Sequence, residues 1–418
     1  MTEDAVPPFP VTIRRIVHPG HETDALRSRF GDPTATWRHG DELRIGYGVA
    51  ARLVFSGPDR IRAAAAAWRS LSAAAQIDTD VPAAAPVAFG AFAFADDSDA
   101  ASVLLLPRVV LVQHDGASHR IELPALHQPT ASTPPSVAAA FAPEAYERAV
   151  AEAVGRIRAG DLEKVVLARD RVLKSPGFDL EMALEVLADR YRGAWVFAVD
   201  GIFGASPETL ATVVVGLATS RVLAGTAPRS ADSRVDDANR ATLLDSPKNR
   251  FEHALAVDSL LLALGGATED LTLGRPFALG LPNVWHLATD ATARIRADVG
   301  ALDLVALLHP TAAVAGAPRA EALGVIRALE PFDRRRYAGP VGWIDGNGDG
   351  EWAIALRSAE VEGPDHVRAY AGAGIVAASD AHQELEETRW KFQPIEEALA
   401  AAVFTDQGIW QAGGRQIP

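Results

Sequence analysis

The chain has 418 residues, of which 48% are hydrophobic and 22% charged, and its formal net charge is −14. This composition is typical of a globular protein with a sizeable core. The acidic excess argues against nucleic acids and anionic membranes as partners, because both attract basic surfaces. The lack of cysteine excludes disulfides, cysteine-bound zinc and thiol catalysis.

The first ten residues, MTEDAVPPFP, have neither the basic nor the apolar region of a secretory signal. No apolar run in the chain approaches the ~20 residues that span a bilayer. We therefore expect a cytoplasmic protein.

Residues 1–142 are predicted to be rich in β-strands. Strand patterns at 43–55 and 87–94 flank an alanine-rich helix at 59–71, and residues 103–123 read as two strands joined at Asp115-Gly116. No catalytic constellation occurs in this part. The segment 127–143, rich in Pro, Ser and Thr, predicts a linker or a long surface connection.

The next part begins with a helix that starts at Pro143 and stops at Gly160. The strand that follows, EKVVLARDRVL, has Lys164, Val166 and Ala168 on one face. Taken alone, a lysine at this place is typical of a strand end that reaches solvent.

Residues 195–216 predict two strands with a bend at Ser206, Pro207 and Glu208. The bend lacks the second glycine of a nucleophile elbow, so a serine hydrolase is excluded. No histidine spacing indicates zinc. The turn DGNGDGE (345–351), in a predicted hairpin at 341–361, imitates a calcium loop but has Leu356 at the twelfth position, so turn chemistry explains it.

The stretch 371–391 predicts a strand end, a turn of small residues and a helix capped by Ser379 or Asp380. Glu384, Glu387 and Lys391 share one face of this helix. Such a stripe is either a solvated face with one ion pair or a site for a divalent metal and an anionic ligand.

These segments together resemble the chorismate-utilising enzymes, and most closely the isochorismate synthases. The resemblance covers 143–399 and differs mainly at Arg335–Arg336 and Ala312. It rests on the motifs KVVLAR (164–169), FGASPETL (203–210), AGTAPR (224–229), KNRFEH (248–253), WHLAT (285–289), LHPTAAVAGAPR (308–319), YAGPVGWID (337–345), ALRSA (355–359), AGAGIV (371–376) and ELEETRWK (384–391).

The resemblance implies an α/β (α+β) fold like that of anthranilate and aminodeoxychorismate synthases. In this fold, two packed antiparallel sheets are flanked by helices. One domain is expected to cover residues 1–418, with a β-rich N-terminal part (1–142) and a chorismate-binding catalytic core (143–400). We also expect a monomer without a glutaminase subunit.

The implied activity is a Mg²⁺-dependent isomerisation, in which water adds at C2 of chorismate and the C4 hydroxyl leaves. By resemblance, Lys164 is the base and Glu208 the acid, and Mg²⁺ is held by Glu252, Glu387 and, through water, Glu384. The residues that the resemblance places at the substrate are Gly225, His286, Ala313, Val314, Arg357, Gly372 and Lys391. The product would feed menaquinone, siderophore or salicylate biosynthesis.

Three alternatives stay open at this point. A salicylate synthase, which also eliminates pyruvate, shares the lysine at position 164. The amine-transferring relatives have another residue there, so Lys164 favours water as the nucleophile. A non-catalytic binding protein would have no need of Lys164, Glu208 and the metal carboxylates together.

Overall fold

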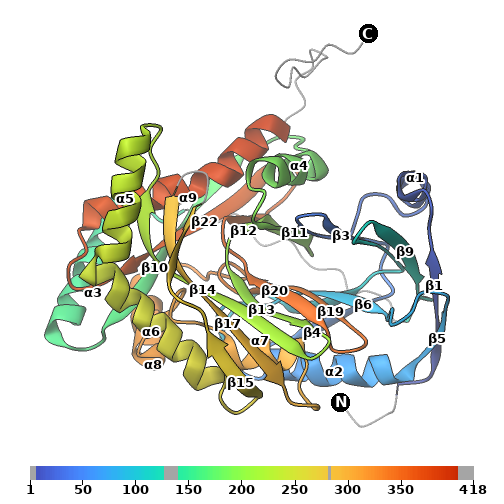
Figure 1. Cartoon of the computed structure of the whole chain (residues 1–418). Coiled ribbons are helices and arrows are strands. Elements are labelled where there is room, and N and C mark those ends of the chain that lie inside the picture. Colours follow the sequence, from blue (N-terminus) through green and yellow to red (C-terminus); the bar gives the residue numbers. More distant parts are fainter. Residues whose placement is uncertain (1–5, 127–139, 281–283, 403–418) are drawn as a thin grey trace.

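The computed structural model describes residues 6–126, 140–280 and 284–402. Two large sheets lie at its centre, and most of the helices are arranged around them (Figure 1). Side chains from both sheets, among them Trp37 and Trp352, join one large hydrophobic cluster. This confirms the predicted fold class of two packed sheets flanked by helices.

The first sheet has twelve strands, and every neighbouring pair is antiparallel except the last, which is parallel. The order across this sheet is β18 (Gly316–Ala317), β10 (Lys164–Lys174), β22 (His366–Ile375), β21 (Ser358–Val361), β12 (Ile202–Ser206), β11 (Trp195–Val199), β2 (Ala35–His39), β3 (Glu42–Tyr47), β8 (Val109–His114), β9 (Ala117–Glu122), β1 (Phe9–Arg15) and β5 (Ala75–Thr79).

The second sheet is antiparallel, with ten strands including one side branch. Its order is β15 (Thr268–Leu273), β17 (Val284–Ile295), β14 (Leu217–Pro228), β13 (Thr209–Val214), β20 (Gly350–Ile354), β19 (Pro340–Asp345), β6 (Val87–Ala91), β7 (Ser102–Leu106) and β4 (Ala51–Phe55), with β16 (Phe277–Gly280) beside β17.

The helices are α1 (Pro19–Phe30), α2 (Arg60–Ala74), α3 (Pro143–Ala159), α4 (Leu180–Arg190), α5 (Ser233–Asp245), α6 (Pro247–Leu264), α7 (Ala301–Leu308), α8 (Arg319–Leu329) and α9 (Ala381–Ala402). No helix in the described ranges is long and apolar enough to cross a membrane. The predicted helix at Pro143 ends at Gly160, which adopts the left-handed conformation (φ 87°) that favours glycine.

Strands from before and after residue 142 pair with each other in both sheets. In the first sheet β2 pairs with β11, and in the second β6 pairs with β19. Residues before 142 thus complete both sheets together with residues after it. Of the predicted linker at 127–143, residues 127–139 lie outside the described residues.

Four sequence predictions merged strands that the structure separates. Residues 43–55 form two strands, β3 and β4, rather than one. Residues 103–123 form three strands rather than two, residues 195–216 also form three, and the predicted hairpin at 341–361 is β19–β20 followed by β21. In each case the chain crosses from one sheet to the other, at 48–50, Pro107–Arg108, Pro207–Glu208 and 355–357. A crossing of two or three residues leaves little trace in a strand pattern. Two of these crossings carry residues that were predicted to act on the substrate.

Candidate active site

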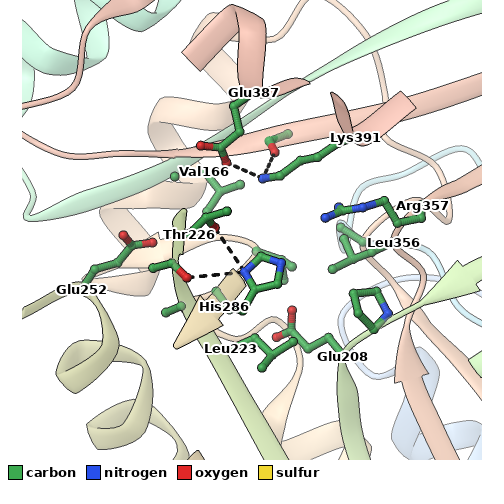
Figure 2. Close-up of a pocket in the computed structure, with 18 of the residues that line it drawn as sticks. Val166, Glu208, Leu223, Thr226, Glu252, His286, Leu356, Arg357, Glu387 and Lys391 are labelled. Carbon is green, nitrogen blue, oxygen red and sulfur yellow. Dashed lines mark hydrogen bonds and ion pairs between the residues drawn. The ribbon is translucent and has the colours of Figure 1, made fainter. Parts of the chain in front are cut away.

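A pocket of about 670 Å³ lies between the two sheets and helices α6 and α9 (Figure 2). Of the site residues predicted from the sequence, only Glu384 is not among those that line it. The lining residues are Lys164, Val166, Pro207, Glu208, Leu223, Ala224, Gly225, Thr226, Glu252, His286, Ala313, Val314, Arg334, Tyr337, Ala338, Leu356, Arg357, Gly372, Gly374, Glu387 and Lys391.

Lys164 begins β10 and points into the pocket rather than to solvent, with 1% of its surface exposed. Its Nζ lies 2.9 Å from Oε1 of Glu252 on α6. Gly374, on the neighbouring strand β22, leaves room for this pair. A Cβ there would lie 3.0 Å from Glu252 Oε1 and 3.2 Å from Lys164 Cε. The glycine-rich end of β22 therefore serves the buried ion pair.

Helix α9 presents Glu387 and Lys391 to the same pocket. Lys391 Nζ lies 2.6 Å from Glu387 Oε1 and donates a second hydrogen bond of 2.7 Å to the Gly372 carbonyl. Burial disfavours the charged form of Glu387, but the charge and hydrogen bond of Lys391 outweigh it and lower the pKa of this carboxyl. The sequence left open whether this helix face is solvated or forms part of a ligand site. The structure shows that it forms a wall of the pocket.

Glu208 lies at the crossing between β12 and β13 and is buried, with 6% of its surface exposed. Its carboxyl group forms no hydrogen bond or ion pair with the described residues. Burial raises the pKa of Glu208 to about 8, although the charges of Lys164, Arg357 and Lys391 act in the opposite direction. At neutral pH this side chain is therefore mostly a neutral acid.

Arg357 lies at the crossing between β20 and β21 and adopts a positive φ of 47°. Its guanidinium group extends toward the pocket and has no ion-pair partner within the described ranges (Figure 2). Burial lowers the pKa of Arg357, yet an arginine stays protonated at neutral pH. A half-buried cation without a partner in the described part of the chain is well placed to bind a carboxylate.

His286 on β17 is held from one side by β14. Its Nδ1 lies 3.1 Å from Thr226 Oγ1 and 3.4 Å from the Gly225 carbonyl. The register of β14 shifts between Leu223 and Thr226, and there Gly225 has φ 87°. Burial lowers the pKa of His286 to about 3, so the ring is neutral. A carbonyl can only accept, which favours the proton on Nδ1 and leaves Nε2 as an acceptor.

A buried ion pair that the sequence analysis missed supports one wall of the pocket. Arg334 donates to Glu330 and also to the carbonyls of Val314 (2.9 Å) and Val166 (2.6 Å). Glu330 in turn accepts 2.7 Å from the Ala168 amide. The strand β18 pairs with β10 over two residues. Farther along the same edge of β10, the Arg334–Glu330 pair binds the backbone groups that a neighbouring strand would otherwise bind. It joins the strand of Lys164 to the turn that carries Val314.

The predicted metal carboxylates do not form a ready-made cluster. No group of three or more His, Cys, Asp or Glu side chains stands at metal-binding distances in the described part of the chain. Glu252 and Glu387 each pair with a lysine instead. Burial and the charge of Glu387 raise the pKa of Glu384 to about 7. Carboxylates that repel each other beside a pocket have the donor chemistry that suits Mg²⁺.

Comparisons with known proteins agree on one family. The family model described as chorismate binding enzyme matches residues 117–400. A Mycobacterium tuberculosis protein named "Putative isochorismate synthase MenF" is 38% identical, over 81% of this chain and 90% of its own length. The Bacillus subtilis isochorismate synthase DhbC is also 38% identical, over 62% of this chain and 68% of its own length.

The fold has solved counterparts as well. The structure of the menaquinone-specific isochorismate synthase MenF from Escherichia coli matches with a TM-score of 0.76, covering 95% of this chain and 96% of the other at 24% identity. At this identity the match supports the fold alone. The family model and the relatives at 38% identity carry the assignment. This chain belongs to the family of chorismate-binding enzymes.

Proposed function

We propose that this protein is an isochorismate synthase, an isomerase that converts chorismate to isochorismate. The observation that carries the proposal is the pairing of a buried neutral acid, Glu208, with the buried amine Lys164 in one pocket beside the unpaired cation Arg357. The names of the relatives agree with this activity.

The reaction needs one base and one acid at different positions of the ring. Lys164 accepts a proton from the water whose oxygen attacks C2. Both ring double bonds then shift, the C4–oxygen bond breaks, and Glu208 gives its proton to the departing hydroxyl. Because burial holds the pKa of Glu208 at about 8, the proton is available at neutral pH.

The two substrate carboxylates require positive charge inside an acidic protein. Arg357 offers a planar fork for the enolpyruvyl carboxylate, with the Gly372 backbone beside it. Lys391 and the backbone at Gly225 take the ring carboxylate. The remaining predicted contacts to the ring are His286, Ala313 and Val314, which line the same pocket.

Mg²⁺ would be held by Glu252 and Glu387 directly and by Glu384 through water, and it would supply positive charge to the ring carboxylate. In the structure the first two carboxylates hold Lys164 and Lys391. Both carboxylates would therefore have to turn away from these lysines to bind the ion.

The substrate is a small molecule, and we expect a cytoplasmic monomer that needs no glutaminase subunit. Incubation of the purified protein with chorismate and Mg²⁺, followed by chromatography of the products, tests the proposal. Isochorismate should be the main product, EDTA should abolish turnover, and added Mg²⁺ should restore it. Salicylate as the main product would indicate a salicylate synthase, and binding without turnover a binding protein. Full activity in EDTA would contradict the metal assignment.

A further inference from the structure

A second pocket, of about 750 Å³, lies on the side of β10 and α9 that faces away from the active site. On β10, Arg169 and Arg171 point to the face opposite that of Lys164. On α9, Arg389 and Gln393 lie opposite Glu387 and Lys391 around the helix. The lining residues are Pro143, Arg169, Arg171, Arg389, Trp390, Gln393 and Glu396.

Arg169 is the unusual member of this pocket. Only 5% of its surface is exposed, and two of its guanidinium nitrogens, Nε and Nη1, are buried without a hydrogen-bond partner among the residues that the structure describes. Its guanidinium group stacks on the ring of Phe392, at 5.4 Å from the ring centroid. A buried charge without a partner is costly, so a native protein rarely keeps one unless something binds to it.

The surroundings of Arg169 are positive although the whole chain carries a net charge of −14. Among the described residues, three arginines and one carboxylate line the pocket. That carboxylate, Glu396, already pairs with Arg171, and Arg389 pairs with Glu386 at the rim. Burial and the charges of Arg171 and Arg389 lower the pKa of Arg169, which shows that its neighbours do not neutralise it.

The start of helix α3 adds to this potential. Pro143, its first residue, lines the pocket, and no side chain caps the helix at Ala142. The exposed amide groups at a helix N-terminus carry a partial positive charge that attracts anions. Glu144 in the first turn of α3 offsets part of this charge, so Arg169 is the main attraction for an anion.

We propose that this pocket binds a small oxyanion, the carboxylate or phosphate group of a metabolite, with Arg169 as its main ligand. The fork of an arginine matches either group with two hydrogen bonds. The ligand would contact the outer faces of β10 and α9, and the inner faces of these elements carry Lys164, Glu387 and Lys391. Binding of the oxyanion would thus stabilise the positions of β10 and α9, which form two walls of the active pocket.

Calorimetric titration of the protein with inorganic phosphate, and separately with citrate, tests this site at constant ionic strength. The two titrations distinguish a phosphate ligand from a carboxylate. We expect Arg169→Met to weaken binding of the preferred anion at least about tenfold, the scale of one lost charge-assisted hydrogen bond, and Arg389→Ala to weaken it less. Two control variants should keep the anion binding that depends on Arg169. Arg357→Met removes the free cation of the active pocket, and Arg62→Ala removes an exposed arginine of α2, far from α9 (Figure 1).

The thermal midpoint without added anion serves as the check on folding. It should stay equal or rise in Arg169→Met, because the substitution removes an unpaired buried charge while keeping most of the side-chain volume. If Arg169→Met does not fold, the comparison between Arg389→Ala and Arg62→Ala decides. Binding that survives Arg169→Met or Arg389→Ala unchanged would overturn the proposal. So would binding that Arg357→Met abolishes, since the anion would then occupy the active pocket.

Discussion

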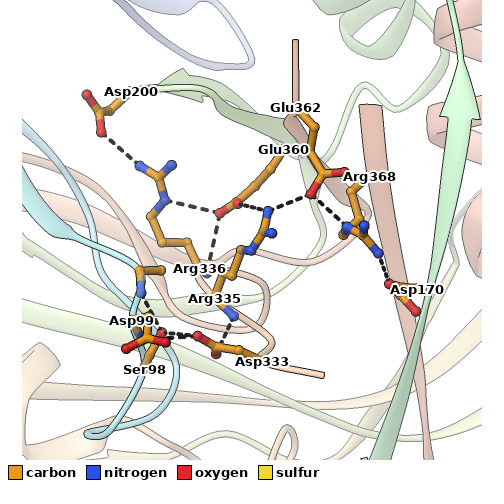
Figure 3. A network of polar contacts seen from close by, with 11 residues as sticks. Ser98, Asp99, Asp170, Asp200, Asp333, Arg335, Arg336, Glu360, Glu362 and Arg368 are labelled. Carbon is orange, nitrogen blue, oxygen red and sulfur yellow. Dashed lines mark hydrogen bonds and ion pairs between the residues drawn. The ribbon is translucent and has the colours of Figure 1, made fainter. Parts of the chain in front are cut away.

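Two buried charged regions lie within this fold, and they differ in how their charges are matched. The first is a network of ion pairs whose members, apart from Arg52, are labelled in Figure 3. Its arginines alternate with its carboxylates and equal them in number. In order along the network the members are Arg52, Asp200, Arg336, Glu360, Arg335, Glu362, Arg368 and Asp170.

The network joins parts of the chain that are distant in sequence. Arg52 lies on β4 in the ten-stranded sheet, and Asp170 lies on β10 in the twelve-stranded sheet. Arg335 and Arg336, the main departure from the family pattern, hold its centre, with Arg335 Nη1 2.7 Å from Glu362. These two arginines therefore have a structural role at the junction of both sheets.

The active pocket is the opposite case. Its acid Glu208 is neutral because of burial, and its cation Arg357 has no ion-pair partner within the described residues. The ion pairs of Lys164 and Lys391 use carboxylates that a metal would need. In a network in which every charge has a partner, the ion pairs stabilise the fold. Charges without a protein partner are available to bind a ligand. Substitutions in the two regions should therefore have different consequences.

The largest effect is expected on turnover in the pocket. Lys164→Ala and Glu208→Gln should each lower kcat by roughly 10²-fold or more, because each removes a positioned proton-transfer group. Lys174→Ala is the matched control, since this lysine ends the same strand outside the pocket. Steady-state rates with chorismate decide. A near-normal rate in Lys164→Ala would reduce this residue to a structural partner of Glu252.

The next effect is on stability, in the network. Glu362→Gln removes one charge from a side chain that is fully buried and leaves the arginines around it in excess. We expect the free energy of unfolding to fall by about 3 kcal/mol, as when a buried pair loses one partner. Glu152→Gln, in an exposed pair on α3, should cost less than about 0.5 kcal/mol. Urea titration measures both.

The turnover rate of the same variant tests whether the network also affects catalysis in the pocket. In Glu362→Gln the kcat of the folded enzyme should stay close to that of the wild type at a temperature well below unfolding. A large loss of kcat in the folded variant would mean that the network acts on the pocket and not only on the fold.

Much of the site could be predicted from the sequence because its residues lie in short motifs with recognisable local structure. Gly225 lies at a bulge, and Glu387 and Lys391 share one turn of a helix whose start is capped by Asp380, which accepts 3.0 Å from the Gln383 amide. Local spacing suffices to place such residues on one face.

What the sequence did not predict depends on contacts between distant segments. Arg334 and Glu330 bind the backbone of residues more than 160 positions earlier, and no motif marks them. The pairing of Glu252 with Lys164 also joins a helix to a strand far from it in sequence. The sequence therefore predicted the residues that line the pocket, but it did not predict the side chains and backbone groups that these residues contact.

A smaller effect is expected on the pH dependence of stability. Burial raises the pKa of Glu208 from 4.5 to about 8, so between these pH values the unfolded chain has released a proton that the folded chain retains. The contribution of Glu208 to the free energy of unfolding is therefore largest below pH 4.5. This contribution is lost as the pH rises toward 8. Glu208→Gln lacks this loss and should be more stable by on the order of 2 kcal/mol at pH 8.

Urea titrations of both proteins from pH 5 to pH 9 test this expectation. The difference in free energy of unfolding should grow up to about pH 8 and then level off. A difference that does not change with pH would mean that Glu208 is ionised in the folded protein, and the role of this side chain as the acid would fail with it.

The smallest effect on stability is expected from the backbone strain at Arg335, which has a φ of 52°. A residue other than glycine costs about 1 kcal/mol in this conformation. Both Arg335→Ala and Arg335→Gly remove the ion pair with Glu362, but only glycine also relieves the strain. Each variant should therefore be less stable than the wild type, with Arg335→Gly more stable than Arg335→Ala by about 0.5 to 1 kcal/mol. If Arg335→Gly equals or exceeds the wild type, the ion pair contributes no more than the strain costs, and the matched network is not what retains an arginine at this position.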